Sequence, residues 1–362
     1  MALSLKFKRN LSRILPFGFI WFLTSWVFLI SDLSLTRNQN INPDTDITLT
    51  LPVIIFGNIT MVLFGLLIGA FEMVVLEKRF RNYSSGRKII YKLGLYLVMC
   101  LLIISIAYPI AASIESNTTI LNPEIWKKLL RFFTSYTSLN TIIQLGFAIF
   151  LSVIYAAISE NLGHVVLRNL LTGKYHSPII EKRVFMFLDM NDSTTIAEKL
   201  GHVVYFQLLR EYYELMSDPI INHSGEVYQY IGDEVVISWK EEQGFIHNNC
   251  IRCFEEIKTN LQKHSTKFIK NFGVAPDFKA GIHVGEVTTG EIGALKKEIV
   301  FTGDVLNTTS RIQSLCKEFN TDLIISEDVY SNIESKDKLS AKPLGSVPLK
   351  GKIQLPKLFS VG

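Results

Sequence analysis

Two aspartates stand where strand-like apolar runs stop. Asp189 follows "RVFMFL", and Asp233 follows Gly232 in "VYQYIGDEVVISW", where two apolar runs meet at a Gly-Asp turn typical of a hairpin. A carboxylate beside buried residues is costly unless it is solvated, paired or bound to a cation. In a split βαβ fold the first strand lies beside the central hairpin. We therefore expect the two carboxylates to approach each other around Mg²⁺ or Mn²⁺, which prefer oxygen ligands.

The residues after Asp189 add a place for phosphate. Ser193 and Thr194 open a helix pattern, and the amides of a helix N-terminus favour a phosphate group. Two metal ions about 3.5–4 Å apart can clamp the attacking and leaving oxygens of an in-line phosphoryl displacement. A plain helix cap is the alternative reading of Asp189 taken alone, and the second aspartate favours the metal–phosphate site.

A third set of polar residues lies in "FTGDVLNTTSRIQ". Asn307 and Arg311 are four residues apart, so they share one face of the predicted helix. An amide and a guanidinium side by side suit a ribose and a phosphoryl transition state. The Gly303-Asp304 turn marks the start of that helix. Pairs with this spacing are often only a solvated face, so the pair gains its weight from the aspartates.

The elements that position these residues follow from the pattern of segment 183–362. A strand ending near Asp189 precedes one long helix that begins at Asp192-Ser193 and runs to Ile221. The hairpin around Asp233, a second amphipathic helix and further strands follow. The order βαββαβ with additions predicts a ferredoxin-like α+β domain, with helices on one face of a mainly antiparallel sheet.

The front of the chain has a different composition. Hydrophobic residues make up 48% of the whole chain and the mean hydropathy is +0.26, which suggests a membrane part. Four apolar segments are each near or above the roughly 20 residues that cross a bilayer as a helix. They are Leu15–Leu33, Leu51–Leu76, Leu93–Ile114 and Leu139–Ala157. We therefore divide the chain into an α-helical membrane domain (1–160) with four transmembrane helices, a connector (161–182) and a catalytic domain (183–362).

The distribution of basic residues predicts the orientation. Basic residues precede the first span and fill the loop between the second and third spans, whereas the loop from Arg37 to Thr50 has one basic residue and two aspartates. The positive-inside rule then favours both termini, and the catalytic domain, in the cytoplasm of a multi-pass protein of the cell (inner) membrane. Asn58 and Glu72 are polar residues within or near the second span. Such residues are often functional, and Glu72 is a candidate for signal reception.

The four cysteines imply no disulfide framework. Cys250 and Cys253 form a C-x-x-C, but no second pair accompanies them, so we interpret them as two residues of a helix. The net charge of +4 is small, and nothing in the sequence predicts a nucleic-acid partner.

Five segments in order resemble the core motifs of the class III nucleotidyl cyclases. They are "FMFLDMNDSTTIAEKLG", "YQYIGDEVVISW", "GIHVGEVTTGEIG", "FTGDVLNTTSRIQ" and "PLKGKIQLPKLFSV". The resemblance extends from Phe185 to the C-terminus, about half of the chain, and the front half is similar to the membrane portions of bacterial members.

The resemblance implies a role for each matching residue. Asp189 and Asp233 match the two metal aspartates, and Met190 would offer its backbone carbonyl to a metal. Asn307 would orient the ribose and Arg311 would stabilise the α-phosphate. Two further positions, Thr194 and Lys350, would contact the triphosphate.

The resemblance also implies a reaction and an assembly. The ribose 3′-oxygen would attack the α-phosphorus and expel pyrophosphate, with two Mg²⁺ or Mn²⁺ ions at each site. One protomer of a homodimer would supply the aspartates, and the other would supply Asn307 and Arg311.

The base-contacting positions leave the substrate open. In the family one position lies three residues before the hairpin glycine and the other seven residues before the ribose asparagine. They are Gln229 and Val300 here, which depart from the usual residues of both adenylate and guanylate cyclases. Glutamine can donate or accept, so it fits either purine. We favour an adenylate cyclase that makes 3′,5′-cyclic AMP from ATP. The alternatives are a guanylate cyclase acting on GTP and a catalytically silent membrane receptor whose sensory ligand is unknown.

Overall fold

The computed structural model describes residues 5–36, 42–76, 79, 85–334, 340–346 and 356–362. The chain divides into two compact units, Met1–Arg168 and Asn169–Gly362. Each unit has its own hydrophobic core, and each is described by itself.

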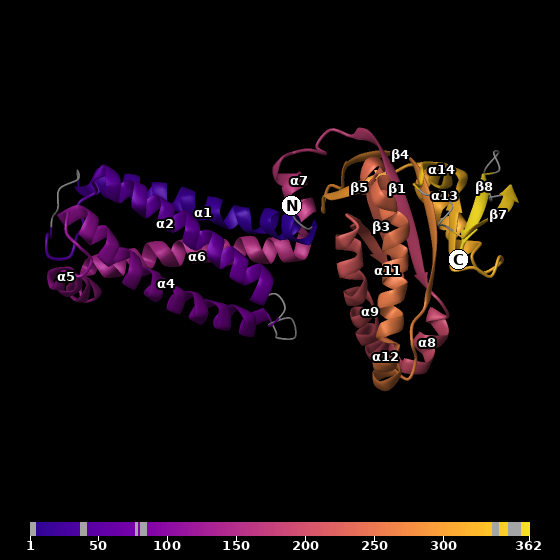
Figure 1. The fold of residues 1–362 in the computed structure, drawn as a ribbon, viewed down its shortest axis with the longest axis horizontal. Helices are drawn as coiled ribbons and strands as arrows, with labels where there is room; N and C mark the ends of the chain where they lie inside the picture. Colours follow the sequence, from indigo (N-terminus) through magenta and orange to yellow (C-terminus); the bar gives the residue numbers. More distant parts are fainter. Residues whose placement is uncertain (1–4, 37–41, 77–78, 80–84, 335–339, 347–355) are drawn as a thin grey trace. The chain divides into compact units, whose positions relative to one another are not determined.

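The first unit consists of helices. They are α1 (Leu5–Thr36), α2 (Leu51–Phe71), the π-helical turn η1 (Glu72–Leu76), α4 (Ser85–Ser116), α5 (Pro123–Phe133), α6 (Tyr136–Leu162) and α7 (His164–Leu171) (Figure 1). Four of them are long and apolar enough to cross a membrane: Arg9–Ser34, Leu51–Phe71, Gly86–Ser116 and Tyr136–Leu162. The predicted spans are therefore confirmed as helices, and they mark a membrane protein. The short amphipathic helix α5 was not predicted.

Small residues allow α1 and α2 to pack closely. A Cβ on Gly65 would come within 2.7 Å of the Trp21 side chain, and one on Gly69 within 2.8 Å of Phe17. The Trp21 indole donates a hydrogen bond of 3.0 Å to Ser152 on α6. Close approach at glycines and hydrogen bonds between helices are the main ways in which membrane helices associate.

Polar residues of this unit are paired in its interior. Glu72, which is 4% exposed, accepts hydrogen bonds from the Lys92 ammonium and the Tyr96 hydroxyl, both on α4. Ser25 donates to Asn58 across 2.6 Å. Glu72 thus lies at the start of the π-helical turn as part of a buried ion pair that joins two helices.

A cavity of about 350 Å³ also lies within this unit. Its lining comes mainly from apolar side chains of α1, α2, α4 and α6, with Asp32, Asn58 and Gln144 among the polar residues. The volume is within the range of small-molecule pockets.

The described residues of the second unit are built on one eight-stranded sheet. Its strands are β1 (Ile179–Met190), β2 (Glu226–Ile231), β3 (Glu234–Lys240), β4 (Phe278–Ile292), β5 (Glu298–Thr302), β6 (Leu323–Ser326), β7 (Ala341–Ser346) and β8 (Lys357–Val361). The order is β2-β3-β1-β4-β6-β8-β7, with β5 paired to β4. The first four strands have the ferredoxin-like order and are antiparallel, so the predicted βαββαβ core is confirmed. β1 begins at Ile179, inside the stretch 161–182 assigned above to the connector.

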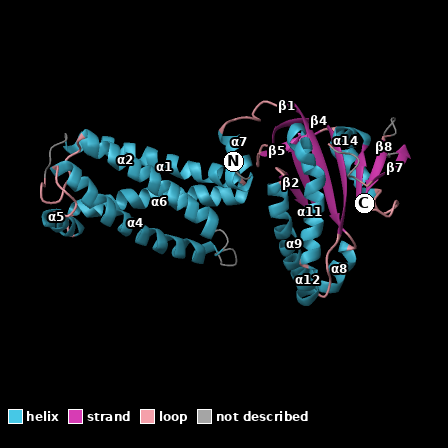
Figure 2. Cartoon of the chain, viewed as in Figure 1, coloured by secondary structure: helices cyan, strands magenta, loops and turns pink. Residues whose placement is uncertain are grey.

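Helices cover both faces of this sheet. They are α8 (Ser193–Leu200), α9 (His202–Asn222), α10 (Glu241–Phe245), η2 (Ile246–Asn248), α11 (Asn249–Lys263), α12 (Ser265–Phe272), α13 (Asp304–Ser314) and α14 (Glu327–Asn332). Alternate residues of β1 point to opposite faces. Val184, Met186 and Leu188 pack in one core with α9 and α11, which run side by side (Figure 2). Phe185 and Phe187 pack in a second core with Val305 of α13.

Two details of the expectation are wrong. The helices do not lie on one face, because α13 covers the face opposite α9 and α11. The single helix predicted after Asp192 is two helices, because Gly201 breaks it with a left-handed φ of +72°. Such a φ is open to glycine without the strain that a Cβ would bring.

The interpretation of the C-x-x-C pair is confirmed. Cys250 and Cys253 are fully buried in α11, where they face the core between the helix and the sheet. Both thiols are free. Burial raises the pKa of Cys250 to about 12 and that of Cys253 well above its ordinary value. The pair therefore packs as two small apolar side chains.

Candidate active site

The two aspartates come from neighbouring strands. Asp189 is near the end of β1, opposite Lys279 on β4. Asp233 lies in the turn between β2 and β3, where Gly232 has a φ of +65°. Because β3 pairs with β1 through Leu188 and Val235, the turn lies beside the end of β1. The Tyr213 hydroxyl of α9 fixes this turn by donating a 2.6 Å hydrogen bond to the Gly232 carbonyl.

The carboxyl groups of Asp189 and Asp233 interact directly. Burial, followed by the charge of Asp233 and a hydrogen bond to it, raises the pKa of Asp189. Only weak partners offset this repulsion: Gln313 Nε2 donates to Asp189 Oδ2 across 3.3 Å, and Lys279 Nζ is 4.0 Å from the same oxygen. Asp233 is less satisfied still, because its Oδ2 is buried and has no hydrogen-bond partner among the described residues.

This arrangement fits a divalent cation. A cation between the two carboxylates would remove their repulsion and satisfy the orphaned oxygen of Asp233. Among the described residues no group of three or more His, Cys, Asp or Glu side chains forms a metal cage. Mg²⁺ is commonly held by one or two carboxylates, with water and substrate phosphates completing its shell. The residues present therefore suit an ion that arrives with a phosphorylated substrate.

Met190 and Thr194 flank the aspartates in different ways. The Met190 side chain is 2% exposed and packs in the core, so only its backbone can serve the site. Thr194 is exposed in the first turn of α8. That turn follows Asp192, whose left-handed φ of +52° turns the chain sharply between β1 and the helix.

Asn307 and Arg311 lie on the outer side of α13. The residues of this helix that pack against the sheet are Val305, Thr308, Thr309, Ile312 and Gln313. With 3.6 residues per turn, Asn307 and Arg311 fall on the opposite side of the helix. Among the described residues no hydrogen bond or ion pair joins either of them to the aspartates of the same chain. The structure thus brings Asp189 and Asp233 together and leaves Asn307 and Arg311 facing away.

The two predicted base-contacting positions lie on β2 and β5. Gln229 is exposed, and Val300 is half-buried opposite Gly290 of β4. Their neighbours touch: the rings of Tyr228 and Phe301 are 4.7 Å apart, and the Phe301 amide donates to the Tyr228 hydroxyl across 3.3 Å. Lys350 lies outside the described residues, so its predicted contact with the triphosphate stays a prediction.

Sequence reasoning missed three polar neighbours of the aspartates. Lys279 gave no signal, because its position opposite Asp189 depends on strand register. Gln313 is a buried polar residue beside apolar Ile312, which is a weak hint of an inward role. Glu234 follows Asp233 directly. Burial, with the charges of Asp189 and Asp233, raises its pKa to about 7.

Comparisons with known proteins identify the family of this part of the chain. The family model of the adenylate and guanylate cyclase catalytic domain matches residues 177–360. The chain is 33% identical over 204 residues to adenylate cyclase 2 of Rhizobium meliloti (strain 1021), covering 56% of each protein. It is 28% identical over 182 residues to adenylate cyclase 1 of the same organism, covering 49% of this chain and 27% of that protein. The matches thus span only about half, or less, of these relatives.

A crystal structure of an adenylyl cyclase from P. aeruginosa has a TM-score of 0.45 and 19% identity, covering 51% of this chain and 96% of that one. The family match spans just over half of the chain and contains both aspartates, Asn307 and Arg311. The chain belongs to the adenylate and guanylate cyclase catalytic-domain family.

Proposed function

We propose that the protein is a membrane-bound adenylate cyclase that converts ATP to 3′,5′-cyclic AMP and pyrophosphate. The observation that carries the proposal is the facing pair Asp189 and Asp233, with a buried oxygen that no described residue satisfies, in a chain of the cyclase family. The names of the relatives from Rhizobium meliloti and Anabaena cylindrica, all adenylate cyclases, favour ATP.

The domains proposed are a membrane domain (1–160), a connector (161–182), whose last residues already form the start of β1, and a catalytic domain (183–362). The basic residues around the first span and between the second and third spans favour a cytoplasmic catalytic domain in the inner membrane. The cytoplasm is also where nucleoside triphosphates are found, so orientation and substrate agree.

Asp189 and Asp233, with the Met190 carbonyl, would hold two Mg²⁺ or Mn²⁺ ions. Such ions favour the 3′-alkoxide and neutralise the triphosphate. Thr194 and Lys350 would bind the triphosphate. Asn307 would orient the ribose so that its 3′-oxygen is in line with the α-phosphorus. Arg311 would donate to the phosphoryl oxygens as their negative charge rises, an interaction strongest in the transition state.

The placement of α13 supports a homodimer. Within one chain its outer face, with Asn307 and Arg311, points away from the sheet that carries the aspartates. A second copy of the chain can bring an identical helix to those aspartates, and twofold symmetry then produces two equivalent sites. Each site would contain the aspartates of one protomer and the Asn307–Arg311 face of the other.

Complementation tests this arrangement. Full-length Asp233→Ala and Arg311→Ala chains are co-expressed with different tags. Each heterodimer has one site with both lesions and one intact site, so random pairing should restore about a quarter of wild-type activity. The matched control mixes Asp233→Ala with Asp189→Ala, which damages both sites of every heterodimer and should restore nothing. If the first mixture is as inactive as each variant alone, the shared site is wrong.

GTP is the second candidate substrate, because Gln229 can donate or accept and Val300 cannot accept a hydrogen bond from the adenine amino group. Cyclic AMP and cyclic GMP are measured from the purified full chain with ATP and GTP at equal concentration. Cyclic AMP as the main product supports the proposal. Cyclic GMP as the main product identifies a guanylate cyclase, and the absence of both products supports the silent receptor.

A further inference from the structure

The segment that follows α7 packs against the end of β4 in the catalytic sheet. Tyr175 is 3% exposed, and its carbonyl accepts a 3.1 Å hydrogen bond from the Glu291 amide of β4. Pro178 packs against Gly290, where an added Cβ would be 3.3 Å from the proline ring. Gly290 in turn pairs with Val300 of β5. The incoming chain thus contacts the residues of β4 that hold one base-contacting position.

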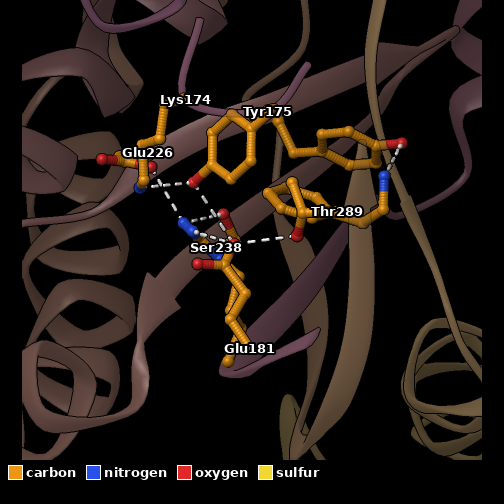
Figure 3. A network of polar contacts seen from close by, with 9 residues as sticks. Lys174, Tyr175, Glu181, Glu226, Ser238 and Thr289 are labelled. Atoms are coloured by element: carbon orange, nitrogen blue, oxygen red, sulfur yellow. Dashed lines mark hydrogen bonds and ion pairs between the residues drawn. The ribbon is translucent and has the colours of Figure 1, made fainter. Parts of the chain in front are cut away.

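The Tyr175 side chain enters a buried polar network (Figure 3). Its hydroxyl accepts from Lys174 Nζ across 2.7 Å and donates to Glu181 Oε1 across 3.4 Å. The same oxygen of Glu181 accepts from the Thr289 hydroxyl at 2.9 Å and from Arg183 Nη1 at 3.1 Å. Glu181 is therefore the point where the incoming segment, β1 and β4 meet.

Arg183 extends this network across the sheet. Its side chain is 2% exposed, and Nη2 donates to Glu226 of β2 at 2.8 Å and to Ser238 of β3 at 3.1 Å. The guanidinium also lies 4.6 Å from the centre of the Phe301 ring of β5. Both terminal nitrogens of this buried guanidinium are hydrogen-bonded in fixed directions, whereas its Nε has no partner among the described residues. Its position therefore depends on four strands at once.

Phe301 links the network to both base positions. The Arg183 guanidinium lies against the Phe301 ring. The Tyr228 ring contacts the same ring, and the Tyr228 hydroxyl accepts a hydrogen bond from the Phe301 amide. Gln229 follows Tyr228, and Val300 precedes Phe301. A shift of the Phe301 ring can therefore be passed along β5 to Val300, and a loss of its contact with Tyr228 removes one of the contacts that place Gln229.

We infer that Tyr175, Arg183 and Phe301 are positioning residues for base discrimination, and that they tie the segment entering from α7 to the two base-contacting strands. The inference rests on the proposed function, because Gln229 and Val300 have their role only in a nucleotide site. It goes beyond that function by assigning selectivity to residues that do not touch the base. Small displacements of positioning groups have large kinetic effects, since misplacement by about 1 Å can cost about 100-fold.

The test uses two variants of the full chain in detergent micelles. Tyr175→Phe removes only the hydroxyl that reaches Glu181, and Phe301→Leu removes the ring that Arg183 and Tyr228 contact. The control is Glu298→Gln, on the same strand as Phe301 but paired with Lys296 on the surface. For each protein kcat and KM are measured with ATP and with GTP.

Both variants should change the ratio of kcat/KM for ATP to that for GTP, by about tenfold in Phe301→Leu and about threefold in Tyr175→Phe, mainly through KM. Glu298→Gln should leave the ratio unchanged. A purely structural role lowers the amount of active protein, which reduces kcat for both nucleotides equally and leaves the ratio as it was. A ratio within about twofold of wild type in both variants overturns the inference.

A second readout separates this inference from the proposed function. Binding of fluorescent N-methylanthraniloyl derivatives of ATP and GTP is measured with the same proteins. If the wild type forms no cyclic nucleotide, the proposed activity fails, but a change in the ratio of the two dissociation constants in Phe301→Leu still supports the positioning role. An unchanged ratio of dissociation constants in both variants overturns it.

Discussion

The two units of the molecule bury carboxylates in opposite ways. In the membrane unit, Glu72 lies between a lysine and a tyrosine, Lys92 and Tyr96, and its charge is fully compensated. In the catalytic unit, Asp189 and Asp233 face each other, and one oxygen of Asp233 has no partner in the part of the chain that the structure describes. The first arrangement is complete within the chain. In the proposed function a cation completes the second arrangement, so Asp189 and Asp233 would form a binding site where Glu72 forms a structural ion pair.

The comparison predicts opposite effects of neutralising the two groups. Removing one partner of a buried ion pair leaves an uncompensated charge and destabilises a protein by about 3–5 kcal/mol. Removing one of two facing carboxylates relieves repulsion and costs the ion site instead of stability. The predictions below test this difference, beginning with the largest effect on folding.

Glu72→Gln should lower the free energy of unfolding of the membrane unit by about 3–5 kcal/mol, because the Lys92 charge is left buried. Thermal and denaturant unfolding of the full chain in micelles, followed by intrinsic tryptophan fluorescence, measures the change. Glu124→Gln is the control, since Glu124 and Lys127 form an exposed pair whose loss should leave the stability almost unchanged.

The double variant Glu72→Gln, Lys92→Met sharpens this prediction. It removes both charges, so most of the loss seen in Glu72→Gln should be regained. If Glu72→Gln is as stable as wild type, the buried pair does not hold α4 against η1, and the contrast between the two units disappears.

Asp189→Asn, unlike Glu72→Gln, should not lower the stability of the fold. With EDTA present it should be as stable as wild type or about 1 kcal/mol more stable, because one of the facing charges is gone. Addition of Mg²⁺ or Mn²⁺ at about 100 times its Kd should raise the unfolding temperature of the wild-type catalytic unit by about 5–10 °C.

The same addition should leave Asp189→Asn almost unchanged, because the site has lost half of its charge. Asn307→Ala serves as the control, since Asn307 lies on the outer face of α13 and is not expected to hold metal. An equal thermal shift in wild type and Asp189→Asn would count against a cation between the two aspartates.

Thr289→Val is expected to have the smallest effect, and one that depends on pH. Burial raises the pKa of Glu181, but the Thr289 hydrogen bond and the charge of Arg183 outweigh it, and the pKa is lowered overall. A carboxyl group with a lowered pKa stabilises the fold above its unfolded pKa, and that contribution is lost as pH falls through the folded value.

Thr289→Val should therefore cost about 1 kcal/mol at pH 7. The difference from wild type should shrink as Glu181 becomes protonated below its ordinary range. Urea unfolding of both proteins at a series of pH values measures it. A difference that stays constant down to pH values at which Glu181 is protonated would show that the hydroxyl acts through packing instead of through the carboxylate.

Local patterns predicted the parts of the fold whose causes are local. The apolar run before Asp189, the Gly232 turn and the four apolar spans each depend on residues that are close in sequence, and each is present in the structure. The approach of Asp189 to Asp233 followed from the strand order of a βαββαβ core. These features depend on period, turn chemistry and topology, which a sequence displays directly.

The remaining features depend on contacts between distant segments. The break at Gly201 was hidden, because helical periodicity continues on both sides of it. The fully buried Arg183 looks like an ordinary strand residue, and its partners Glu226 and Ser238 are identified only by the register of β1, β2 and β3. The placement of α13 on the second face depends on which side of the sheet the chain crosses, which residue types alone do not encode.

The burial of the thiols has a practical consequence for spectroscopy. All four cysteines, Cys100, Cys250, Cys253 and Cys316, are buried, and burial raises the pKa of Cys316 to about 12, as it does for Cys250. Thiolate is the form that reacts with maleimides, so the native chain should stay almost unlabelled at neutral pH. A single cysteine introduced at an exposed position such as Leu295 would then carry a spin label or fluorophore alone. Distances between labels in paired chains would report the assembly of the protein in its membrane without first removing any native residue.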